Sequence, residues 1–184
     1  MRCHAMVIMV MTEGGALGID LMRCGAGVNR VPLPSVSAGR RLLILACSER
    51  KIPVRLPRPA LHRYDGPAFR VLRRYLREEG PVSDLAICIL SAEHGLIGGD
   101  VAIADYDRRM TARRAKELRP TTMASLQAIL QQGRFREVFI CVGRPYRRAL
   151  AGIDDKSGTP IRWTTRGLGG RLTELRDWLR EPVQ

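Results

Sequence analysis

The sequence lacks any pair of cysteines spaced as C-x-x-C, although it contains five cysteines. The common zinc sites use such pairs, and an odd cysteine count argues against a disulfide framework. We therefore expect neither a metal site nor a disulfide scaffold. Cys88 and Cys141 lie inside apolar runs, which is typical of small buried side chains. Unpaired cysteines fit a reducing compartment, so the sequence predicts a cytoplasmic protein.

Long hydrophobic runs are also missing: none approaches the roughly 20 residues that a transmembrane helix needs. We therefore expect no membrane partner. The apolar segment 5–11 is too short for the core of a secretory signal and lacks the usual cleavage pattern. The glycine-rich segments 14–18 and 167–170 match neither the dinucleotide-binding nor the Walker fingerprint, so no nucleoside triphosphate and no cofactor is expected.

Lysine is scarce, since only Lys51, Lys116 and Lys156 are present, and arginine carries nearly all of the positive charge. The chain has 31 Lys+Arg against 18 Asp+Glu, a formal net charge of +13. Such a balance favours polyanionic partners, mainly nucleic acid, with DNA expected before RNA. Arginine suits bidentate contacts to phosphate. A GC-rich genome produces the same bias, and the arginines would then simply be solvated.

Two groups of arginines are the expected contacts to nucleic acid. One group lies on the polar side of a helix predicted to follow Gly66, and the other begins a helical stretch after Thr111. The residues concerned are Arg70, Arg73, Arg74, Arg113 and Arg114.

Residues 1–40 differ from the rest of the chain, because they are rich in glycine and show no persistent helical or strand period. We interpret them as a flexible or poorly structured extension, or as an upstream start that adds non-native sequence. Residues 41–184 are predicted to form a single α/β domain. Strands that alternate with helices indicate a three-layer fold around a mostly parallel sheet of about four strands.

The predicted strands cover residues 42–46, 85–90, 138–142 and 161–164. Proline makes 51–62 a loop, and 91–107 is also expected to be a loop. Asp65 is a plausible N-cap for the first helix. Pro120 is expected to end one helix and begin another. The last helix should bury a stripe formed by Leu172, Leu175, Trp178 and Leu179.

The first chemical motif, Cys47-Ser48-x-x-Lys51, lies where the first predicted strand ends. Ligands of open α/β sheets bind outside the carboxyl ends of the strands. A cysteine there is a nucleophile if a cation lowers its pKa, and a lysine forms an imine or holds a phosphate. The alternative is that Cys47 is only the last buried strand residue and Ser48 satisfies the backbone of the loop.

The second motif, Tyr64-Asp65-Gly66, precedes the first predicted helix. The face of Tyr64 could stack on an unpaired nucleobase, or it could cover the edge of the core. The third motif, Ser91-Ala92-Glu93-His94-Gly95, follows the second predicted strand.

Glu93 and His94 are proton-transfer candidates, and Gly95 would let the backbone turn or approach a ligand. The alternative is a tight turn with polar residues facing solvent. Tyr106 and Asp107 belong to the same segment, where Asp107 is either a carboxylate partner or a cap.

Taken together, these motifs resemble a widespread bacterial and phage domain family whose members are often labelled peroxide-stress (YaaA-like) proteins. The Cys47-Ser48-x-x-Lys51 corner is similar to one in archaeosine-synthase-type proteins, whose domain resembles the uracil-DNA-glycosylase fold. The resemblance covers about residues 41–110. It implies a glycosylase-like strand order and a domain that handles nucleobases or binds nucleic acid.

We therefore expect a nucleic-acid-associated protein that acts in DNA protection, repair or base modification, and as an enzyme it would excise or exchange a base. The alternatives are a non-catalytic DNA-binding stress protein and an enzyme of free nucleosides or nucleotides. The expected catalytic residues are Ser48, Lys51, Glu93, His94 and Asp107. The expected substrate contacts are Cys47, Tyr64, Gly66, Ser91, Gly95 and Tyr106.

Overall fold

The computed structural model describes residues 39–181 except 54, 81 and 154–157. The predicted N-terminal extension therefore lies outside the described residues, apart from Gly39 and Arg40. Arg40 already belongs to the first strand, one residue earlier than the predicted domain start. Among the described residues, no helix is long and apolar enough to cross a membrane.

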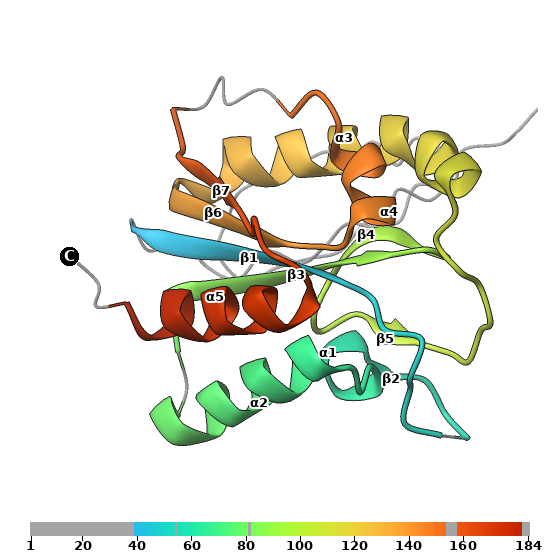
Figure 1. Cartoon of the computed structure of the whole chain (residues 1–184), viewed down its shortest axis with the longest axis horizontal. Coiled ribbons are helices and arrows are strands. Elements are labelled where there is room, and N and C mark those ends of the chain that lie inside the picture. The colour runs from blue at the N-terminus through green and yellow to red at the C-terminus, as the bar shows by residue number, and fades with distance from the viewer. Residues whose placement is uncertain (1–38, 54, 81, 154–157, 182–184) are drawn as a thin grey trace, which may run out of the picture.

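The molecule is a three-layer α/β fold around a five-stranded sheet in the order β4-β3-β1-β6-β7 (Figure 1). The strands are β1 (Arg40–Ala46), β3 (Leu85–Ser91), β4 (Gly95–Gly98), β6 (Phe135–Cys141) and β7 (Ile161–Trp163). All neighbours pair in parallel except β3 and β4, which form an antiparallel hairpin. The predicted α/β class with a mostly parallel sheet is confirmed, with β4 as an additional strand.

Helices cover both faces of this sheet. One layer holds α2 (Pro67–Glu79) and α5 (Leu168–Arg180), and the other holds α3 (Ala112–Gly133), α4 (Arg144–Arg147) and the 3-10 turn η1 (Arg148–Leu150). The remaining elements are β2 (Arg58–Pro59), α1 (Ala60–Arg63) and β5 (Ala102–Ile103), of which β2 and β5 pair as a small separate sheet.

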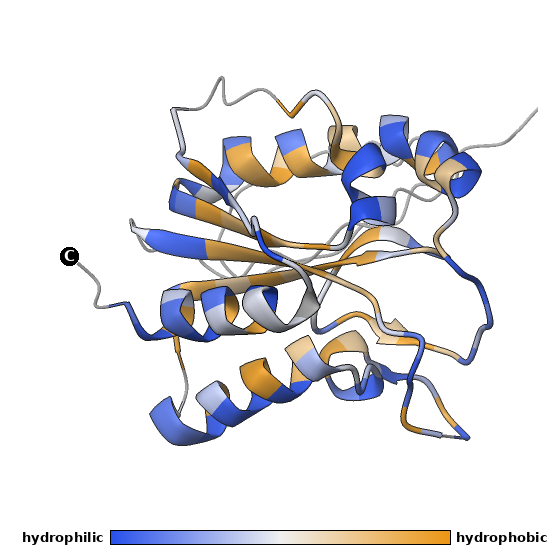
Figure 2. Ribbon diagram, in the orientation of Figure 1, coloured by the Kyte–Doolittle hydropathy of each residue, from blue (hydrophilic) through white to orange (hydrophobic). Residues whose placement is uncertain are grey.

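The alternation of side chains explains why β1 is continuously apolar. Leu43 and Leu45 pack in the core under α2 and α5, whereas Leu42 and Ile44 pack in the core under α3. A strand covered on both faces needs apolar side chains in both directions. Figure 2 shows the same pattern, with hydrophobic strands in the centre and hydrophilic colour along the outer sides of the helices.

Several local expectations were wrong. The segment 91–107 is not all loop, because Gly95–Gly98 returns along β3, and 51–62 contains β2 and α1. Pro120 lies inside the single helix α3 rather than between two helices, since the buried stripe formed by Leu118, Leu126 and Ile129 continues past it. Asp65 does not cap α2: the N-cap is Gly66, and the carboxylate of Asp65 binds arginines instead.

The strand order places a topological switch point between β1 and β6. The chain leaves β1 toward β3 on one side, and the later strands β6 and β7 lie on the other side. Crevices that bind ligands in open α/β sheets form at the carboxyl ends of strands at such a point.

Candidate functional site

Three strands end side by side at this edge of the sheet. Ala46 lies opposite Leu90 in β3, and Leu45 lies opposite Cys141 in β6. Continuing the register places Cys47 between Ser91 and Gly143. The amide of Cys47 donates to the carbonyl of Leu90 at 3.0 Å, which holds the thiol at the end of the row.

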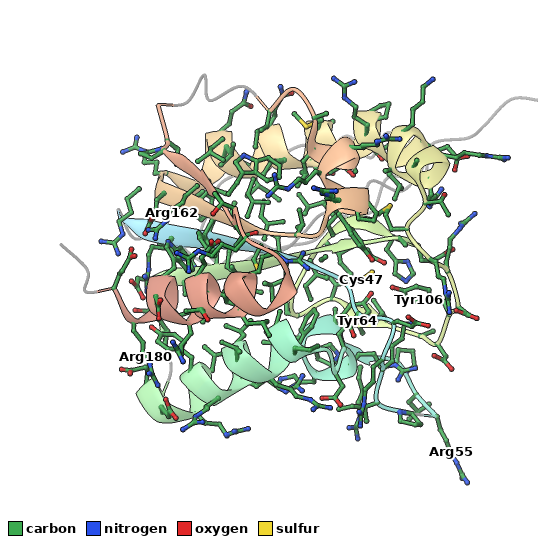
Figure 3. All side chains as sticks on the ribbon, in the orientation of Figure 1. Cys47, Arg55, Tyr64, Tyr106, Arg162 and Arg180 are labelled. Atoms are coloured by element: carbon green, nitrogen blue, oxygen red, sulfur yellow. The ribbon has the colours of Figure 1, made fainter. Side chains whose placement is uncertain are left out.

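A cluster of hydroxyl groups covers the β3 side of this row. The hydroxyl oxygens of Tyr64 and Tyr106 lie 2.5 Å apart, and the Tyr106 oxygen lies 3.0 Å from Oγ of Ser91. Figure 3 shows Cys47, Tyr64 and Tyr106 gathered beyond the end of β1, while Arg162 and Arg180 lie at the opposite end of the sheet. The first and third motifs therefore lie side by side at the carboxyl ends of β1 and β3.

On the β6 side, the partner of Cys47 is Tyr146, which the sequence analysis missed. Its hydroxyl oxygen lies 3.1 Å from Sγ of Cys47. Tyr146 follows β6 in the short helix α4 and is separated from Cys47 by 99 residues. The strand end at Val142 was a usable signal, because residues that follow a central strand of a parallel sheet reach the same edge as those after β1.

The cluster is electrically neutral near physiological pH. Burial raises the pKa of Tyr64 to about 12. Burial likewise raises the pKa of Tyr106 and of Tyr146 well above the ordinary value for tyrosine. These hydroxyl groups therefore keep their protons, and each can donate one hydrogen bond and also accept.

The loop after β1 is fastened to the segment that carries Tyr64. Lys51 forms an isolated antiparallel bridge with Tyr64, and the amide of Ile52 donates to the carbonyl of Arg63 at 2.8 Å. This pairing brings the ammonium of half-buried Lys51 to 4.3 Å from the ring centroid of Tyr106. A cation at the face of an aromatic ring is attracted by the ring quadrupole. Lys51 thus places a positive charge at the rim of the hydroxyl cluster.

Gly66 and Ser48 contact each other beside the same loop. A Cβ on Gly66 would lie 2.5 Å from Oγ of Ser48. Only glycine therefore allows Ser48 its observed position. The role of Gly66 is close packing within the protein.

The tight turn between β3 and β4 is organised by Ser91. Its Oγ accepts hydrogen bonds from the amides of Glu93 (3.1 Å) and His94 (3.2 Å). The same oxygen accepts a longer hydrogen bond, of 3.4 Å, from the hydroxyl of Tyr64 and lies 3.0 Å from that of Tyr106. The exposed ring of His94 stands edge-on to Tyr106 with centroids 5.2 Å apart, which places an imidazole at the rim.

Other predicted site residues lie apart from the cluster or carry other contacts. Gly95 has φ of 71° in the turn and packs toward Leu118 of α3, so it serves the turn. Asp107 is exposed, and Glu93 pairs with Arg108 at 3.1 Å. The Tyr64 ring is fully buried against Phe69, so its face is closed to a stacking base and only its hydroxyl reaches the cluster.

The predicted nucleic-acid arginines divide between the two outer layers. Arg70 and Arg73 bind the carboxylate of Asp65 at 2.9 and 2.7 Å, and the hydrogen bond from Arg70 is the main cause that lowers the pKa of Asp65. Arg74 pairs with Glu78 on the same helix, α2.

On α3, in the opposite layer, Arg113 and Arg114 both pair with Glu117. Arg114 also donates to the carbonyls of Ala92 (2.7 Å) and Glu93 (2.9 Å), which fixes the turn after β3. Arg114 is thus a structural support of the site. The described residues contain no group of three or more His, Cys, Asp or Glu side chains that could hold a metal ion.

Comparison with known proteins supports the fold. No curated protein matches this sequence. The crystal structure of AF0587, a protein of unknown function, superimposes with a TM-score of 0.50 at 16% identity, over 78% of this chain and 46% of that one. The chain thus spans less than half the length of that protein. Residues 42–181 match a family of unknown function, DUF6884. The matched residues include the hydroxyl cluster and all of the sheet except the first two residues of β1. The chain therefore belongs to the DUF6884 family.

Proposed function

We propose that this protein handles nucleobases at the carboxyl edge of its sheet, and that it takes them from nucleic acid, acting in protection, repair or modification. The observation that carries the proposal is the cluster of neutral hydroxyls at the β1 end, with Lys51 and His94 at its rim.

Neutral groups of this kind suit a base better than an ion. The edge of a nucleobase presents uncharged donors and acceptors, and enzymes that act on bases read that edge by hydrogen bonds inside a pocket. Hydroxyls that hold their protons can satisfy either type of group. Lys51 would then approach the sugar or phosphate. The resemblance of the Cys47-Ser48-x-x-Lys51 corner to archaeosine-synthase-type proteins, and of the motif set to peroxide-stress proteins, supports the same class.

As an enzyme, the protein would excise or exchange a base. In excision, the bond between C1′ of the sugar and the base nitrogen breaks, the oxygen of water bonds to C1′ as a hydroxyl, and the remaining water proton ends on the base nitrogen. His94 places an imidazole at the rim of the cluster, where it can move that proton. Tyr106 would orient the base, with its own hydroxyl held by Tyr64 and Ser91.

The arrangement of the arginines favours a second function, that of an enzyme acting on free nucleosides or nucleotides. Those on α2 and those on α3 lie in opposite layers and bind carboxylates of the protein itself. A continuous basic face beside the site would have favoured a polymer, whereas paired and dispersed arginines suit a small substrate.

The test incubates the protein with labelled DNA, RNA and nucleosides and follows binding by anisotropy and released base by mass spectrometry. Tyr106→Phe removes one hydroxyl of the cluster, and Tyr75→Phe on α2 is the matched control at a site outside it. We expect base release from nucleic acid that falls at least tenfold in Tyr106→Phe and persists in Tyr75→Phe. Release from nucleosides alone would favour the second function, and binding without release a non-catalytic protein. Neither binding nor release would contradict the proposal.

A further inference from the structure

Three carboxylates around the site are already engaged. Glu49, Asp65 and Glu93 each bind an arginine. Arg171, in contrast, is half-buried in the first turn of α5 and forms no ion pair with any of the described residues. Removing a charge from water without a partner costs free energy, so a half-buried cation left unpaired points to an anion from outside the protein.

Arg171 reaches the switch point through the gap over Gly143, which has no side chain to crowd it. Its Nη1 lies 3.0 Å from the position that a Cβ on Gly143 would occupy. Gly143 follows β6 and, by the strand register, is the neighbour of Cys47. The guanidinium therefore lies at the end of β6, on the side of Cys47 opposite the cluster of Tyr64, Tyr106 and Ser91.

The nearest acidic residue on the same helix does not neutralise Arg171. Glu174 follows one turn later, and its carboxylate accepts hydrogen bonds at 2.9 Å from both the amide and the hydroxyl of Thr165. The same carboxylate also pairs with Arg166 at 3.7 Å. The charge of Arg171 nevertheless acts on the buried thiol of Cys141. Burial raises the pKa of that thiol to about 11, and the positive charge of Arg171 works against this rise.

The geometry points to Arg171 as the residue that binds the anionic part of the substrate, a phosphate group seated over Gly143 beside Cys47. This inference rests on the proposed function and assigns it a phosphorylated substrate, with the base toward Tyr106 and the phosphate toward Arg171. A guanidinium matches the oxygen atoms of a phosphate with two parallel hydrogen bonds. The phosphate is either that of a nucleoside monophosphate or that of a nucleic-acid backbone.

The experiment compares binding of a nucleoside, its 5′-monophosphate, inorganic phosphate and a short single-stranded DNA by titration calorimetry. Arg171→Gln removes the charge. Gly143→Ala keeps the charge but fills the gap, and so separates local geometry from long-range attraction. Arg176→Gln is the matched control, because Arg176 is an exposed arginine of the same helix that pairs with Asp177. Thermal unfolding of each variant confirms that it is folded.

We expect the wild type and Arg176→Gln to bind the monophosphate or the DNA at least tenfold more tightly than the nucleoside. Arg171→Gln and Gly143→Ala should lose that preference and keep nucleoside binding. Tighter binding of DNA than of the monophosphate identifies the backbone as the source of the phosphate. A preference that survives in Arg171→Gln, or equal affinity for nucleoside and monophosphate in the wild type, would overturn the inference and leave the proposed function standing. If phosphate binds through Arg171 but the nucleoside does not bind, the anion site is supported and the proposed nucleobase function is contradicted.

Discussion

Tyr64 is the most enclosed tyrosine of the cluster, and its pKa of about 12 makes stability depend on pH in a defined direction. The folded protein holds this proton more tightly than the unfolded chain, where tyrosine titrates near 10. The contribution is therefore fully present below pH 10 and is lost as the pH rises toward 12. Tyr106 and Tyr146 act in the same direction, because burial raises their pKa as well.

We predict that the free energy of unfolding falls between pH 10 and 12, and that Tyr64→Phe makes this fall shallower. Urea unfolding across the range measures the free energy, and absorbance of the phenolate reports the titration. Tyr75→Phe is the control and should leave the slope close to that of the wild type. A Tyr64→Phe profile that overlays the wild-type profile would contradict the proposed burial of this proton.

Gly66 and Ser48 form a pair whose packing can be tested directly. A Cβ at Gly66 would meet both Oγ of Ser48 at 2.5 Å and its Cβ at 2.9 Å, so rotation of the hydroxyl alone cannot relieve the overlap. We predict that Gly66→Ala lowers the free energy of unfolding by about 1–3 kcal/mol, the usual cost of overpacking. Adding Ser48→Gly should restore part of the loss. Chemical denaturation of both single variants and the double variant measures the coupling, and simple additivity would argue against this contact.

At the scale of elements, the strongest patterns in the sequence predicted the fold and the short ones did not. The runs at 42–46 and 85–90 are continuous and apolar because strands covered on both faces have no polar side, and both are confirmed as parallel neighbours. The strand Gly95–Gly98 was missed because its two glycines and four residues read as a turn. Its pairing with β3 depends on contacts that no local period encodes.

The site was predicted only in part, because some of its residues follow strong sequence patterns and others do not. Cys47 and Ser91 follow obvious strands, so their convergence followed from the rule on strand ends. Tyr146 and Arg171 were missed, because neither lies in a segment with a periodic apolar pattern. Tyr146 stands among arginines, and Arg171 follows a glycine-rich segment. Their position depends on the order of β6 relative to β1, which the sequence alone does not specify.

The helix α3 allows a test at this scale, because Pro120 lies exposed within it. Proline has no amide hydrogen to donate to the preceding turn, and its ring crowds that turn. We predict that Pro120→Ala raises the free energy of unfolding by about 1–3 kcal/mol, as the missing backbone hydrogen bond is restored. Thermal and urea unfolding measure the change. The exposed exchange Ala124→Ser in the same helix is the control, and a destabilised Pro120→Ala would show that the proline at this position is needed for packing.

For the whole molecule, residues 39–181 already supply both core layers and the full sheet, and the family match begins at residue 42. We predict that a chain beginning at Gly39 unfolds cooperatively with a midpoint within about 4 °C of the full chain, which corresponds to roughly 1 kcal/mol for a protein of this size. Scanning calorimetry of the two chains measures this. Loss of the cooperative transition in the shorter chain would mean that residues 1–38 complete the core.

The net charge of +13 supplies the last test, because it distinguishes a polymer from a small molecule as the substrate. Each arginine that contacts a phosphate releases counterions, so the logarithm of the affinity falls linearly with the logarithm of the salt concentration. Arg113 is the arginine to reverse, since it is exposed and its ion pair is with Glu117 on the same helix, whereas Arg114 also holds the turn after β3.

We predict that Arg113→Glu weakens binding of DNA of any sequence at low salt by about tenfold and reduces the salt slope by about 1. Arg162→Glu, at the opposite end of the sheet, should leave both unchanged. Anisotropy across a salt series gives the slopes. Binding that ignores salt and Arg113→Glu alike would assign the site to a free nucleoside or nucleotide, because a substrate held by the hydroxyl cluster and Arg171 makes no contact with the exposed side chain of Arg113.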